Sequence, residues 1–576
     1  MCGIIGVVSL NNEKINVCKI LAEGIKRLDY RGYDSWGLAL YSNGLLKSHL
    51  RKVGECGINS DYDYGLHQTG IGHTRWATDG EVSEANAHPH RSDDFSIVHN
   101  GIVENIEYFE TLGTYGRQIT DTEAVVKWMA KDPSRYVSVP QAVFLEIEGS
   151  NSMIIEHLGD LTVLCKGKDL YIGKTKDAYI IASEAQTLSG WCDTCIVVKN
   201  DCRQVSANPK FNSWMKSCEM IQVPMGVFDK KTTMLEEIYQ QATPIKRATL
   251  DQLHWCGRVP YRLNPTPKII VGCGSSYNAA LFGRMCFNDA GVSARAEYSS
   301  EYKHWISDEE KHHDLIAISQ SGETKDTLDI IDQPCIAIVN NENSKMAREN
   351  YLIPVGVGPE FAVAATKTFT MSCFRILEMA VNTRLFSIRT NFKDYIDSGS
   401  FSGLVKDMLE MDNRIGEFVH ATDFDRCIFL GSKYNYPMAR EGALKMTEVA
   451  YIPSSAMPAS EVKHGPIALV DQKCLCVFLD DGTVQTRSNL YEIKSRGGRT
   501  MFITQDNHEN MDLIADVVFS NNAVKSANFK RLNPCIRNAL TAILNNIPLQ
   551  LLAYHTATKK GINPDRPRNL AKTVTV

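Results

Sequence analysis

Short apolar runs divide the chain into two kinds of sequence. Up to about residue 215, β-rich runs such as residues 37–41, 96–99 and 161–164 stand between two or three helical patterns. Mixed strands and helices of this kind predict a layered α+β domain. The apolar pairs Ile4-Ile5 and Val7-Val8 further predict that the start of the chain enters a strand instead of fraying.

From about residue 268 onward, short strand-like runs alternate with helical patterns, at 268–272, 315–318, 335–339 and 427–430. This alternation predicts parallel sheets covered by helices. Residues 274–278 (Gly-Ser-Ser-Tyr-Asn) recur as 431–435 (Gly-Ser-Lys-Tyr-Asn), at an offset of 157 residues (274 to 431), each after a strand and before a helix. The second half is therefore predicted to be a duplicated doubly wound α/β domain.

The junction between the two kinds of sequence is polar. Residues 225–243 include the charged run 229–231 (Asp-Lys-Lys) and a predicted helix over 234–241, which favours a linker. We expect a first domain at 1–215, a linker at 216–245, and two α/β domains at 246–395 and 396–576. A chain of 576 residues is long enough for each domain to bury its own core.

Composition and charge exclude several classes of function. Lys and Arg number 62 against 67 Asp and Glu, a net charge of −5, and no basic run is interleaved with aromatic residues. We therefore expect no nucleic-acid partner. No apolar stretch reaches the about 18 residues of a membrane span, and charged residues come too early for a secretory signal. We expect a cytoplasmic protein with no membrane partner.

The 17 cysteines are scattered without a disulfide-like spacing, which suits reduced thiols. Cys192 and Cys195 form a CxxC pair, but no second pair at zinc spacing follows. We therefore expect no metal and no cofactor.

The second residue is a cysteine. Removal of Met1 would turn the backbone nitrogen of Cys2 into a free α-amine, whose ordinary pKa of about 7.7–8.0 lets a useful fraction accept the thiol proton near neutral pH. Cys2 is therefore a candidate nucleophile with its own base. Taken alone, the dipeptide favours a small residue of no special role. The predicted strand supplies the tethered terminus that such a nucleophile requires.

Three segments of the first domain carry groups that together could hold an amino acid: residues 73–78, 100–101 and 120–123. The guanidinium of Arg75 could bind a carboxylate through two hydrogen bonds, and Asp121 could bind an α-ammonium. The side chain of Asn100 and the N–H of Gly101 could form an oxyanion hole for thiol attack on an amide. Each residue by itself is also compatible with a surface ion pair or a turn.

These segments resemble the class II glutamine amidotransferases, which are N-terminal-nucleophile hydrolases. The resemblance rests on residues 1–6 (Met-Cys-Gly-Ile-Ile-Gly), 30–35 (Tyr-Arg-Gly-Tyr-Asp-Ser), 73–76 (His-Thr-Arg-Trp), 86–90 (Asn-Ala-His-Pro-His) and 99–101 (His-Asn-Gly). It implies an N-terminal-nucleophile hydrolase layer domain with Cys2 as the nucleophile. The implied roles of the other residues are an oxyanion hole for Asn100 and Gly101, glutamine binding for Arg75, Thr78 and Asp121, and a gate over the ammonia exit for Trp76.

A hydroxyl-rich turn at residues 319–324 (Ser-Gln-Ser-Gly-Glu-Thr) follows the predicted strand 315–318 and precedes a helical run beginning near Asp326. Hydroxyls and backbone N–H groups in such a turn can hold a monophosphate, although a polar helix cap has the same pattern. Ser276 follows the neighbouring strand and would add a second wall at the same sheet edge. With no Walker-type lysine and no dinucleotide fingerprint, a sugar phosphate fits better than a nucleotide.

The second α/β copy carries a different set of groups. Where the first copy has its hydroxyl-rich turn, the second has Asp480 and Asp481, which would repel phosphate, so we expect the two copies to have different tasks. Glu441, Lys445 and Glu448 share one face of a predicted helix, a spacing that taken alone favours a solvated salt-bridge ladder. His464 and Lys572 add groups capable of acid-base and imine chemistry.

These segments resemble the sugar isomerase domains of the glutamine:fructose-6-phosphate amidotransferase family. The resemblance covers the whole chain and is strongest at residues 319–324, 441–448, 463–466 and 567–576. It implies that Glu448 is the isomerisation base, Lys445 its neighbour, Lys572 the imine-forming lysine and His464 the ring-opening acid-base group, donated across a homodimer interface. The implied phosphate ligands are Ser276, Ser319, Gln320, Ser321 and Thr324, and the implied sugar contacts are Val363 and Ala571.

Three departures from the family pattern stand near these segments: Asp79 replaces a usual histidine, Ala365 a usual serine and Trp36 a usual alanine. The implied reaction uses glutamine and fructose 6-phosphate as small-molecule substrates and makes glucosamine 6-phosphate, the first step of hexosamine synthesis. Two alternatives stand beside it. One is a class II glutaminase that aminates another acceptor, and the other is a non-enzymatic sugar-phosphate sensor.

Overall fold

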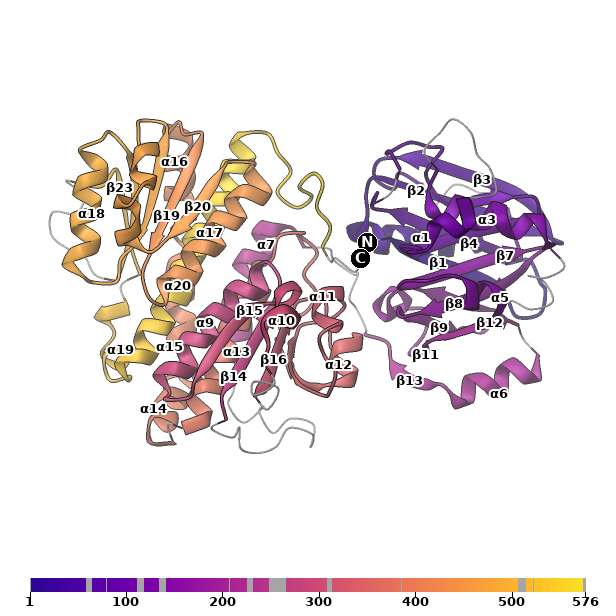
Figure 1. Cartoon of the computed structure of the whole chain (residues 1–576), viewed down its shortest axis with the longest axis horizontal. Helices are drawn as coiled ribbons and strands as arrows, with labels where there is room; N and C mark the ends of the chain where they lie inside the picture. Colours follow the sequence, from indigo (N-terminus) through magenta and orange to yellow (C-terminus); the bar gives the residue numbers. More distant parts are fainter. Residues whose placement is uncertain are drawn as a thin grey trace. The chain divides into compact units, whose positions relative to one another are not determined.

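The computed structural model describes residues 2–58, 65–78, 80–110, 119–133, 141–206, 208–224, 232–247, 266–307, 313–384, 386–505, 514–521 and 523–572. It divides into two compact units (Figure 1): the first unit holds Met1–Lys231 and Ala571–Val576, and the second unit holds Thr232–Leu570. No described helix is long and apolar enough to cross a membrane. The domain boundaries expected from the sequence stay predictions.

The first unit contains two antiparallel sheets. One has the strand order β13 (Glu219–Gln222), β11 (Thr194–Val198), β9 (Leu170–Lys174), β10 (Ala178–Ala182), β1 (Gly3–Ser9), β4 (Thr69–Arg75), β2 (Ser35–Ser42), β3 (Leu45–Val53). The other has the order β12 (Asp201–Val205), β8 (Asp160–Lys166), β7 (Asn151–His157), β6 (Phe95–Gly101), β5 (His90–Ser92). The strand expected at the start of the chain is confirmed, because β1 lies in the middle of its sheet between β10 and β4.

Alternating side chains of β1 show how the layers form. Ile5 belongs to the core beneath α1 together with Leu21, whereas its neighbour Ile4 belongs to the core between the two sheets together with Ile154. Successive side chains of a strand point to opposite faces, so both faces of this sheet are covered. The described helices are α1 (Val17–Leu28), α2 (Ile106–Glu110), α3 (Asp121–Lys131), α5 (Gln141–Glu146) and α6 (Pro209–Ser217).

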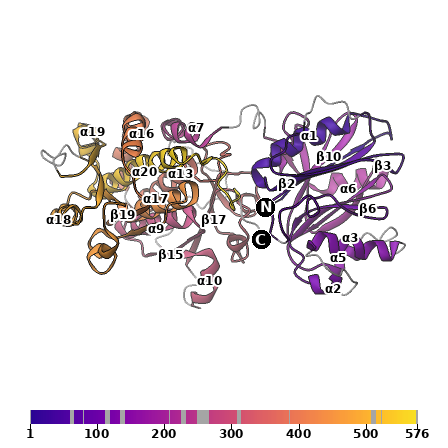
Figure 2. The same cartoon turned by 90° about the horizontal axis from the view of Figure 1, so that it is seen from above.

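Helix α1 packs on the first sheet and α3 on the second (Figures 1 and 2), so the unit is a layered α+β fold as the sequence predicts. More helices are present than the two or three helical patterns expected. Helices α2 and α5 have five and six residues, which is too short for a 3.6-residue period to be visible in the sequence.

The second unit contains two parallel sheets. The first has the strand order β15 (Ala294–Tyr298), β14 (Lys268–Gly272), β16 (Asp314–Ser319), β17 (Ile336–Val339), β18 (Tyr351–Pro354). The second has the order β20 (Ser454–Met457), β19 (Arg426–Gly431), β21 (Cys474–Leu479), β22 (Arg499–Thr504), β23 (Val517–Ser520). Both follow the same doubly wound order, in which the crevice beside the first strand is the usual ligand site. The predicted duplication and the parallel sheets are confirmed.

The structure corrects the register of this duplication. Gly272 ends β14 and Gly431 ends β19, and a Cβ on either glycine would lie within 3 Å of backbone atoms four residues later, in Ser276 or Asn435. Two residues after each glycine, Gly274 and Lys433 have positive φ angles of 54° and 52°. The copies are therefore offset by 159 residues (274 to 433) and not by 157. The offset predicted from the five-residue match was wrong. The strand-turn-helix geometry is what repeats, and the matching residues stand two positions away from their structural counterparts.

Helices cover both faces of each parallel sheet. Ile270 of β14 belongs to the core shared with α9 and α13, whereas Ile269 and Val271 belong to the core beneath α12. The helices are α7 (Met234–Tyr239), α8 (Ala242–Arg247), α9 (Ser275–Asp289), α10 (Ser299–Trp305), α11 (Lys325–Leu328), α12 (Lys345–Glu349), α13 (Lys367–Arg384), α14 (Phe386–Asp397), α15 (Ser400–Leu409), α16 (Asp412–Ala421), α17 (Asn435–Ala450), α18 (Val484–Lys494), α19 (Ala527–Lys530) and α20 (Pro534–Lys559).

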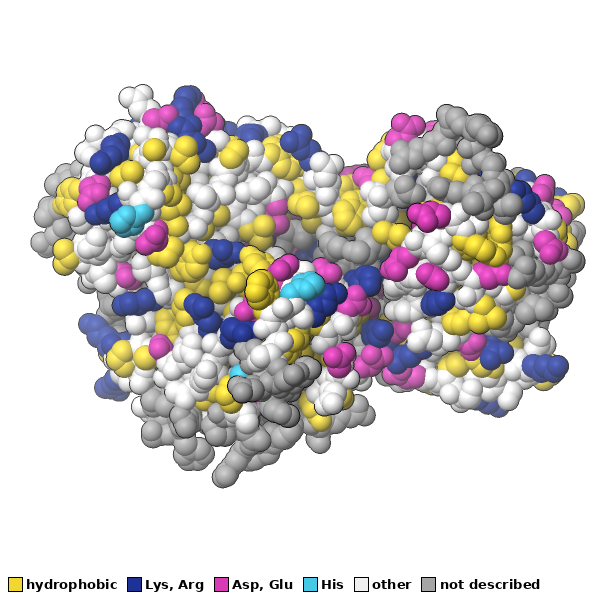
Figure 3. Space-filling view, viewed as in Figure 1, with side chains coloured by type: hydrophobic (Ala, Val, Ile, Leu, Met, Phe, Trp, Pro, Cys, Tyr) yellow, Lys and Arg dark blue, Asp and Glu magenta, His cyan; other side chains and the backbone are white. Residues whose placement is uncertain are grey.

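Helices α9, α13, α17 and α20 pack against one another and join the two sheets into one core. At the surface, basic and acidic side chains are interspersed over the described part of the face drawn in Figure 3. This mixed surface agrees with the small net charge of −5.

Candidate active sites

The first candidate site lies where β1 begins and β4 ends. Cys2 is half-buried directly before β1, and its Sγ lies 3.8 Å from the carbonyl oxygen of Trp76. The next residue, Gly3, pairs with Thr74 across the sheet, and its N–H donates to the Thr74 hydroxyl at 3.1 Å. The structure therefore places the predicted nucleophile beside the predicted gate residue.

The segment 30–35 supports this arrangement. A Cβ at Gly32 would lie 2.5 Å from the backbone of Arg75 and of Trp76, so only glycine lets the two segments approach so closely. Asp34 accepts a hydrogen bond from the N–H of Ala77 at 2.8 Å. The motif therefore fixes the backbone that carries Arg75 and Trp76.

The predicted oxyanion residues end β6. His73 in β4 donates from Nε2 to the carbonyl oxygen of His99 at 2.9 Å, which joins the two sheets two residues before Arg75 and Gly101. Asn100 is buried and Gly101 is half-buried. Gly101 has no room for a side chain, because a Cβ would lie 2.7 Å from the Nε2 of His99. The ends of β4 and β6 thus bring Arg75, Asn100 and Gly101 into one region.

Asp121 stands at the first position of α3 and is held as a carboxylate. Its oxygens accept hydrogen bonds from the backbone N–H of Val103 at 3.0 Å and of Thr122 at 2.6 Å. Burial alone would raise the pKa of Asp121, but His99 and these N–H groups lower it to about 2. Asp121 therefore carries a negative charge at neutral pH, as binding of an ammonium group requires.

The other two predicted glutamine ligands differ in their surroundings. Arg75 is buried, and its guanidinium donates to the carbonyl oxygens of Gly80 and Glu81, each at 3.1 Å. Thr78 is exposed. The departure at Asp79 lies outside the described residues. Hydrogen bonds to these two backbone carbonyls thus fix the orientation of the Arg75 guanidinium.

A buried histidine cluster beside this region was missed by the sequence analysis. It consists of His73, His88, His90 and His99, and the rings of His73 and His88 stack at 4.1 Å. All four residues stand inside the motifs quoted for the resemblance, but nothing in their spacing indicates that strands from two sheets bring their rings together.

In the second unit, the hydroxyl-rich turn lies at the carboxyl end of β16, beside the end of β14. The Ser319 hydroxyl accepts from the N–H of Gly322 at 2.9 Å and lies 3.1 Å from that of Thr324. Gly322 has a φ of 67°, and a Cβ there would collide with Ser344. The predicted helix after the turn is short, because α11 has four residues. Hydroxyls and the tight turn, more than a helix dipole, define this candidate phosphate site.

The corrected register explains how the second copy differs. The counterpart of Ser276 is Asn435, which is buried and whose Nδ2 donates to the carbonyl oxygen of Asp480 at 3.1 Å. The Asn435 side chain thus bonds to the turn that corresponds to the phosphate turn of the first copy. Asp480 itself accepts from the Thr504 hydroxyl at 2.8 Å. Asp481 accepts from the N–H of Thr483 at 3.1 Å, directly before α18. These carboxylates organise a turn.

The Glu441–Lys445–Glu448 cluster lies on α17 and is not a solvated ladder. Glu441 and Lys445 are 0% and 1% exposed, so that interpretation is wrong. The Lys445 ammonium lies 3.1 Å from Glu441 and forms a second ion pair with Glu448, which is partly exposed. Burial alone would lower the pKa of Lys445, but the two carboxylates raise it above its usual value. Lys445 is therefore a permanent cation beside the predicted base.

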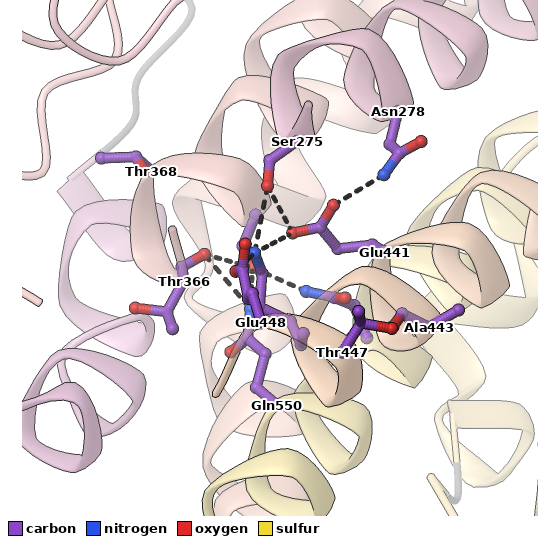
Figure 4. A network of polar contacts seen from close by, with 12 residues as sticks. Ser275, Asn278, Thr366, Thr368, Glu441, Ala443, Thr447, Glu448 and Gln550 are labelled. Atoms are coloured by element: carbon purple, nitrogen blue, oxygen red, sulfur yellow. Dashed lines mark hydrogen bonds and ion pairs between the residues drawn. The ribbon is translucent and has the colours of Figure 1, made fainter. Parts of the chain in front are cut away.

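Two residues of the first α/β copy hold the Glu441–Lys445–Glu448 cluster in place and were missed by the sequence analysis. Ser275 donates to Oε1 of Glu441 at 2.8 Å, and Asn278 donates to Oε2 at 2.8 Å (Figure 4). Lys445 in turn donates to the Ser275 hydroxyl at 3.1 Å. Both come from the first turn of α9, directly beside Ser276. The two α/β copies therefore build one polar site between α9 and α17.

We expect Lys445→Met to destabilise the second unit by about 3 kcal/mol, because it leaves the buried Glu441 carboxylate without its cation. Urea unfolding of the full chain measures this loss. The double variant, which also carries Glu441→Gln, removes the unpaired carboxylate charge and should recover much of the lost free energy of unfolding. A loss below about 1 kcal/mol in the single variant would show that the pair contributes little.

The remaining predicted residues are spread over the second unit and the tail. His464 is exposed after the turn Ala459–Lys463. Val363 is half-buried, and its N–H donates to the carbonyl oxygen of Asp565 at 3.0 Å. The N–H of Arg568 donates to the Tyr451 hydroxyl at 2.6 Å, three residues beyond Glu448. The tail is thus tied to the end of α17 four residues before Lys572. Ala571 and Lys572 are grouped with the first unit.

The cysteine pair of the first unit has the features of core residues. Cys192 and Cys195 are both buried, and burial raises the pKa of Cys192 to about 11. No group of three metal-ligating side chains occurs among the residues that the structure describes.

Comparison with known proteins identifies relatives along the whole chain. The SIS domain family matches residues 268–382 and 422–560, one match to each parallel sheet region. A glutamine–fructose-6-phosphate aminotransferase (isomerizing) of Bacteroides thetaiotaomicron is 32% identical, and one of Yersinia pseudotuberculosis is 34% identical, with 100% of each chain covered in both cases. Among solved structures, the C-terminal domain of glucosamine-fructose-6-phosphate aminotransferase from Francisella tularensis is 28% identical, with a TM-score of 0.49, over 59% of this chain and 99% of that chain.

Proposed function

The chain belongs to the family of isomerizing glutamine–fructose-6-phosphate aminotransferases, and from this membership we infer that it converts glutamine and fructose 6-phosphate into glutamate and glucosamine 6-phosphate. The observation that carries this conclusion is the extent of the likeness, since relatives of this name match over the whole of both chains. The protein is a transferase with a glutamine amidotransferase part and two SIS sugar isomerase domains.

We propose that the first unit is an N-terminal-nucleophile hydrolase. The stack of two antiparallel sheets between α1 and α3, with Cys2 at the start of a central strand, supports this fold. After removal of Met1, the α-amine of Cys2 accepts the thiol proton, and the thiolate attacks the glutamine side-chain amide. The tetrahedral intermediate expels ammonia and leaves a thioester, which water hydrolyses to glutamate and free Cys2.

In this half-reaction, the side chain of Asn100 and the N–H of Gly101 stabilise the oxyanion. Arg75 binds the α-carboxylate, and Asp121 binds the α-ammonium. The lowered pKa of Asp121 supports its role, because the carboxylate stays ionised over the pH range in which the α-amine of Cys2 is active. Thr78 is the third glutamine ligand, and Trp76, whose carbonyl oxygen lies beside Cys2, gates the exit of ammonia.

For the second half-reaction, we propose that fructose 6-phosphate binds in the crevice between β14 and β16. Its phosphate is held by Ser276, Ser319, Gln320, Ser321 and Thr324. His464, supplied by the second subunit of a homodimer, opens the sugar ring. Lys572 forms an imine at C2 with loss of water, ammonia replaces the lysine there, and Glu448 moves a proton from C1 to C2. Val363 and Ala571 contact the sugar.

The Lys445 ammonium supports the role of Glu448. The ion pair with the buried Lys445 holds the Glu448 carboxylate in place. Ammonia is passed internally between the two reactions, because ammonia released to water would be protonated and lost as a nucleophile.

We expect Ser276→Ala to raise the KM for fructose 6-phosphate about tenfold, because it removes one hydroxyl donor to a charged phosphate. Steady-state kinetics with varied fructose 6-phosphate measure this change. Ser432→Ala, at the end of β19 in the second copy, is the matched control and should leave KM unchanged. Equal increases in KM in the two variants would show that the phosphate is not bound preferentially by the first copy.

The function is tested by incubating the protein with glutamine and fructose 6-phosphate and quantifying glutamate and glucosamine 6-phosphate. Equal amounts of both products are expected. Glutamate without the amino sugar would show that a different acceptor is aminated. Formation of neither product would leave the interpretation as a sugar-phosphate sensor.

A further inference from the structure

Thr122, the second residue of α3, lies at the centre of the buried histidine cluster in the first unit. Its hydroxyl oxygen lies 2.9 Å from Nε2 of His88, 2.9 Å from Nδ1 of His99 and 3.1 Å from a carboxylate oxygen of Asp121. Thr122 is 0% exposed. A single buried hydroxyl therefore contacts three titratable side chains.

The hydrogen-bond partners fix where the histidine protons lie. His73 faces the carbonyl oxygen of His99 with Nε2, and a carbonyl only accepts, so Nε2 of His73 carries the proton. Burial lowers the pKa of His73 to about 3 and that of His88 well below its usual value, so both rings are neutral. The Nδ1 atoms of His73 and His88 are buried and have no hydrogen-bond partner among the residues that the structure describes, which agrees with protons on Nε2.

The ring of His99 is oriented in the same way. Asn151 donates from Nδ2 to the carbonyl oxygen of Glu148 at 2.9 Å, so its Oδ1 faces His99 and accepts from Nε2 at 2.8 Å. Nδ1 of His99 lies 2.9 Å from the Thr122 hydroxyl oxygen, and that hydroxyl donates to Oδ1 of Asp121 at 3.1 Å. The oxygen of Thr122 keeps lone pairs to accept from Nε2 of His88.

This chain of bonds ends beneath the proposed oxyanion hole. Gly101 pairs with Asn151 between β6 and β7, and a Cβ on Gly101 would lie 2.6 Å from Oδ1 of Asn151 and 2.7 Å from Nε2 of His99. The backbone of Gly101 therefore rests directly on the hydrogen bond between His99 and Asn151. Any rotation of the His99 ring would displace Asn100 and Gly101.

We propose that Thr122 is a positioning residue for glutamine hydrolysis, whose hydroxyl orients His99 and through it the oxyanion donors Asn100 and Gly101. This inference rests on the proposed glutaminase function. Removal of the hydroxyl takes away the group that lies 2.9 Å from both Nδ1 of His99 and Nε2 of His88 in a buried region, so the ring of His99 reorients. Binding of glutamine depends less on Thr122, because Asp121 keeps its bonds from the N–H groups of Val103 and Thr122.

The test compares Thr122→Val, which keeps the shape and removes the hydroxyl, with Thr122→Ser, which keeps the hydroxyl. Loss of one oxyanion donor costs roughly 10²–10³ in kcat, so its displacement should cost about tenfold or more. We expect Thr122→Val to lower the kcat of glutamate formation by that factor with KM for glutamine changed less than about threefold. Thr122→Ser should restore most of the kcat. Thr122→Ala provides the same comparison if the valine variant does not fold.

Thr120→Val is the matched control. The Thr120 hydroxyl is also buried, lies 2.8 Å from Nε2 of His90 and caps the start of α3, but it forms no hydrogen bond with His99 among the described residues. This variant should lower the melting temperature and leave kcat nearly unchanged. A kcat within twofold of the wild type in Thr122→Val, or an equal loss in Thr120→Val, would overturn the inference. Absence of glutamate formation by the wild-type chain would instead overturn the proposed function.

Discussion

Replacement of Cys2 by alanine is expected to abolish glutamate formation from glutamine and to leave slow hexose-phosphate isomerisation intact. Cys2 is the only group of the proposed mechanism that bonds to the amide carbon, and loss of a nucleophile of this kind lowers kcat by roughly 10⁴-fold or more. Isomerisation is retained because the proposed base Glu448 and the side chains that hold its cluster lie on α17 and α9 of the second unit. Product quantification with glutamine and with fructose 6-phosphate separately measures both activities.

Cys218→Ala is a matched control for this prediction. Cys218 is also a half-buried thiol of the first unit, and its Sγ lies 3.4 Å from the carbonyl oxygen of Trp214, much as that of Cys2 lies near Trp76. It should retain full glutaminase activity. Equal loss of both activities in Cys2→Ala would contradict the assignment of two separate sites.

The second large effect is expected for Glu448→Gln, which should lower amino-sugar formation by about 10²–10⁴-fold, the usual contribution of a general base. The amide keeps the size of the side chain but cannot accept the proton from C1. The fold should be retained because Lys445 keeps its ion pair with Glu441 at 3.1 Å. Glutamate formation should be within about twofold of the wild type, since the first unit is untouched.

Glu492→Gln is the control for Glu448→Gln. Glu492 lies on α18 and pairs with Lys463 at 2.6 Å. Its replacement therefore also removes a carboxylate that is paired with a lysine. Its amino-sugar formation should equal that of the wild type. Retention of more than about a tenth of the activity in Glu448→Gln would show that another group moves the proton.

Local patterns predicted the elements that carry the chemistry. Apolar pairs at Ile4-Ile5 and Val7-Val8 predicted β1 and therefore the tethered Cys2, because a short apolar run is a property of neighbouring residues. The ends of β14 and β16 predicted that Ser276 and Ser319 share a sheet edge, because parallel strands end at the same side.

Long-range contacts could not be predicted in this way. The helical spacing of Glu441, Lys445 and Glu448 gives their shared face, but the sequence does not tell which element covers that face. Here α9 covers it with Ser275 and Asn278, more than 160 residues away along the chain. The role of Thr122 was invisible for the same reason, since its partners His88 and His99 come from separate segments of the first unit.

The register of the duplication shows a different limit. The sequence match placed Gly274 opposite Gly431, whereas the structure places Gly272 there, because the close approach of a strand-ending glycine to the following helix is what repeats. The shift of two residues puts Asn435 opposite Ser276. The first copy thus has a serine beside its hydroxyl-rich turn, whereas the second has an amide side chain that bonds to the corresponding turn.

The most direct test of the account follows the nitrogen atom. The full-length protein is incubated with fructose 6-phosphate and glutamine labelled with ¹⁵N at the side-chain amide, in the presence of excess unlabelled ammonium, and the glucosamine 6-phosphate formed is analysed by mass spectrometry. We expect glucosamine 6-phosphate that carries ¹⁵N, in an amount equal to the glutamate released. Glutamate without the amino sugar, or an amino sugar that carries the unlabelled nitrogen, would contradict it.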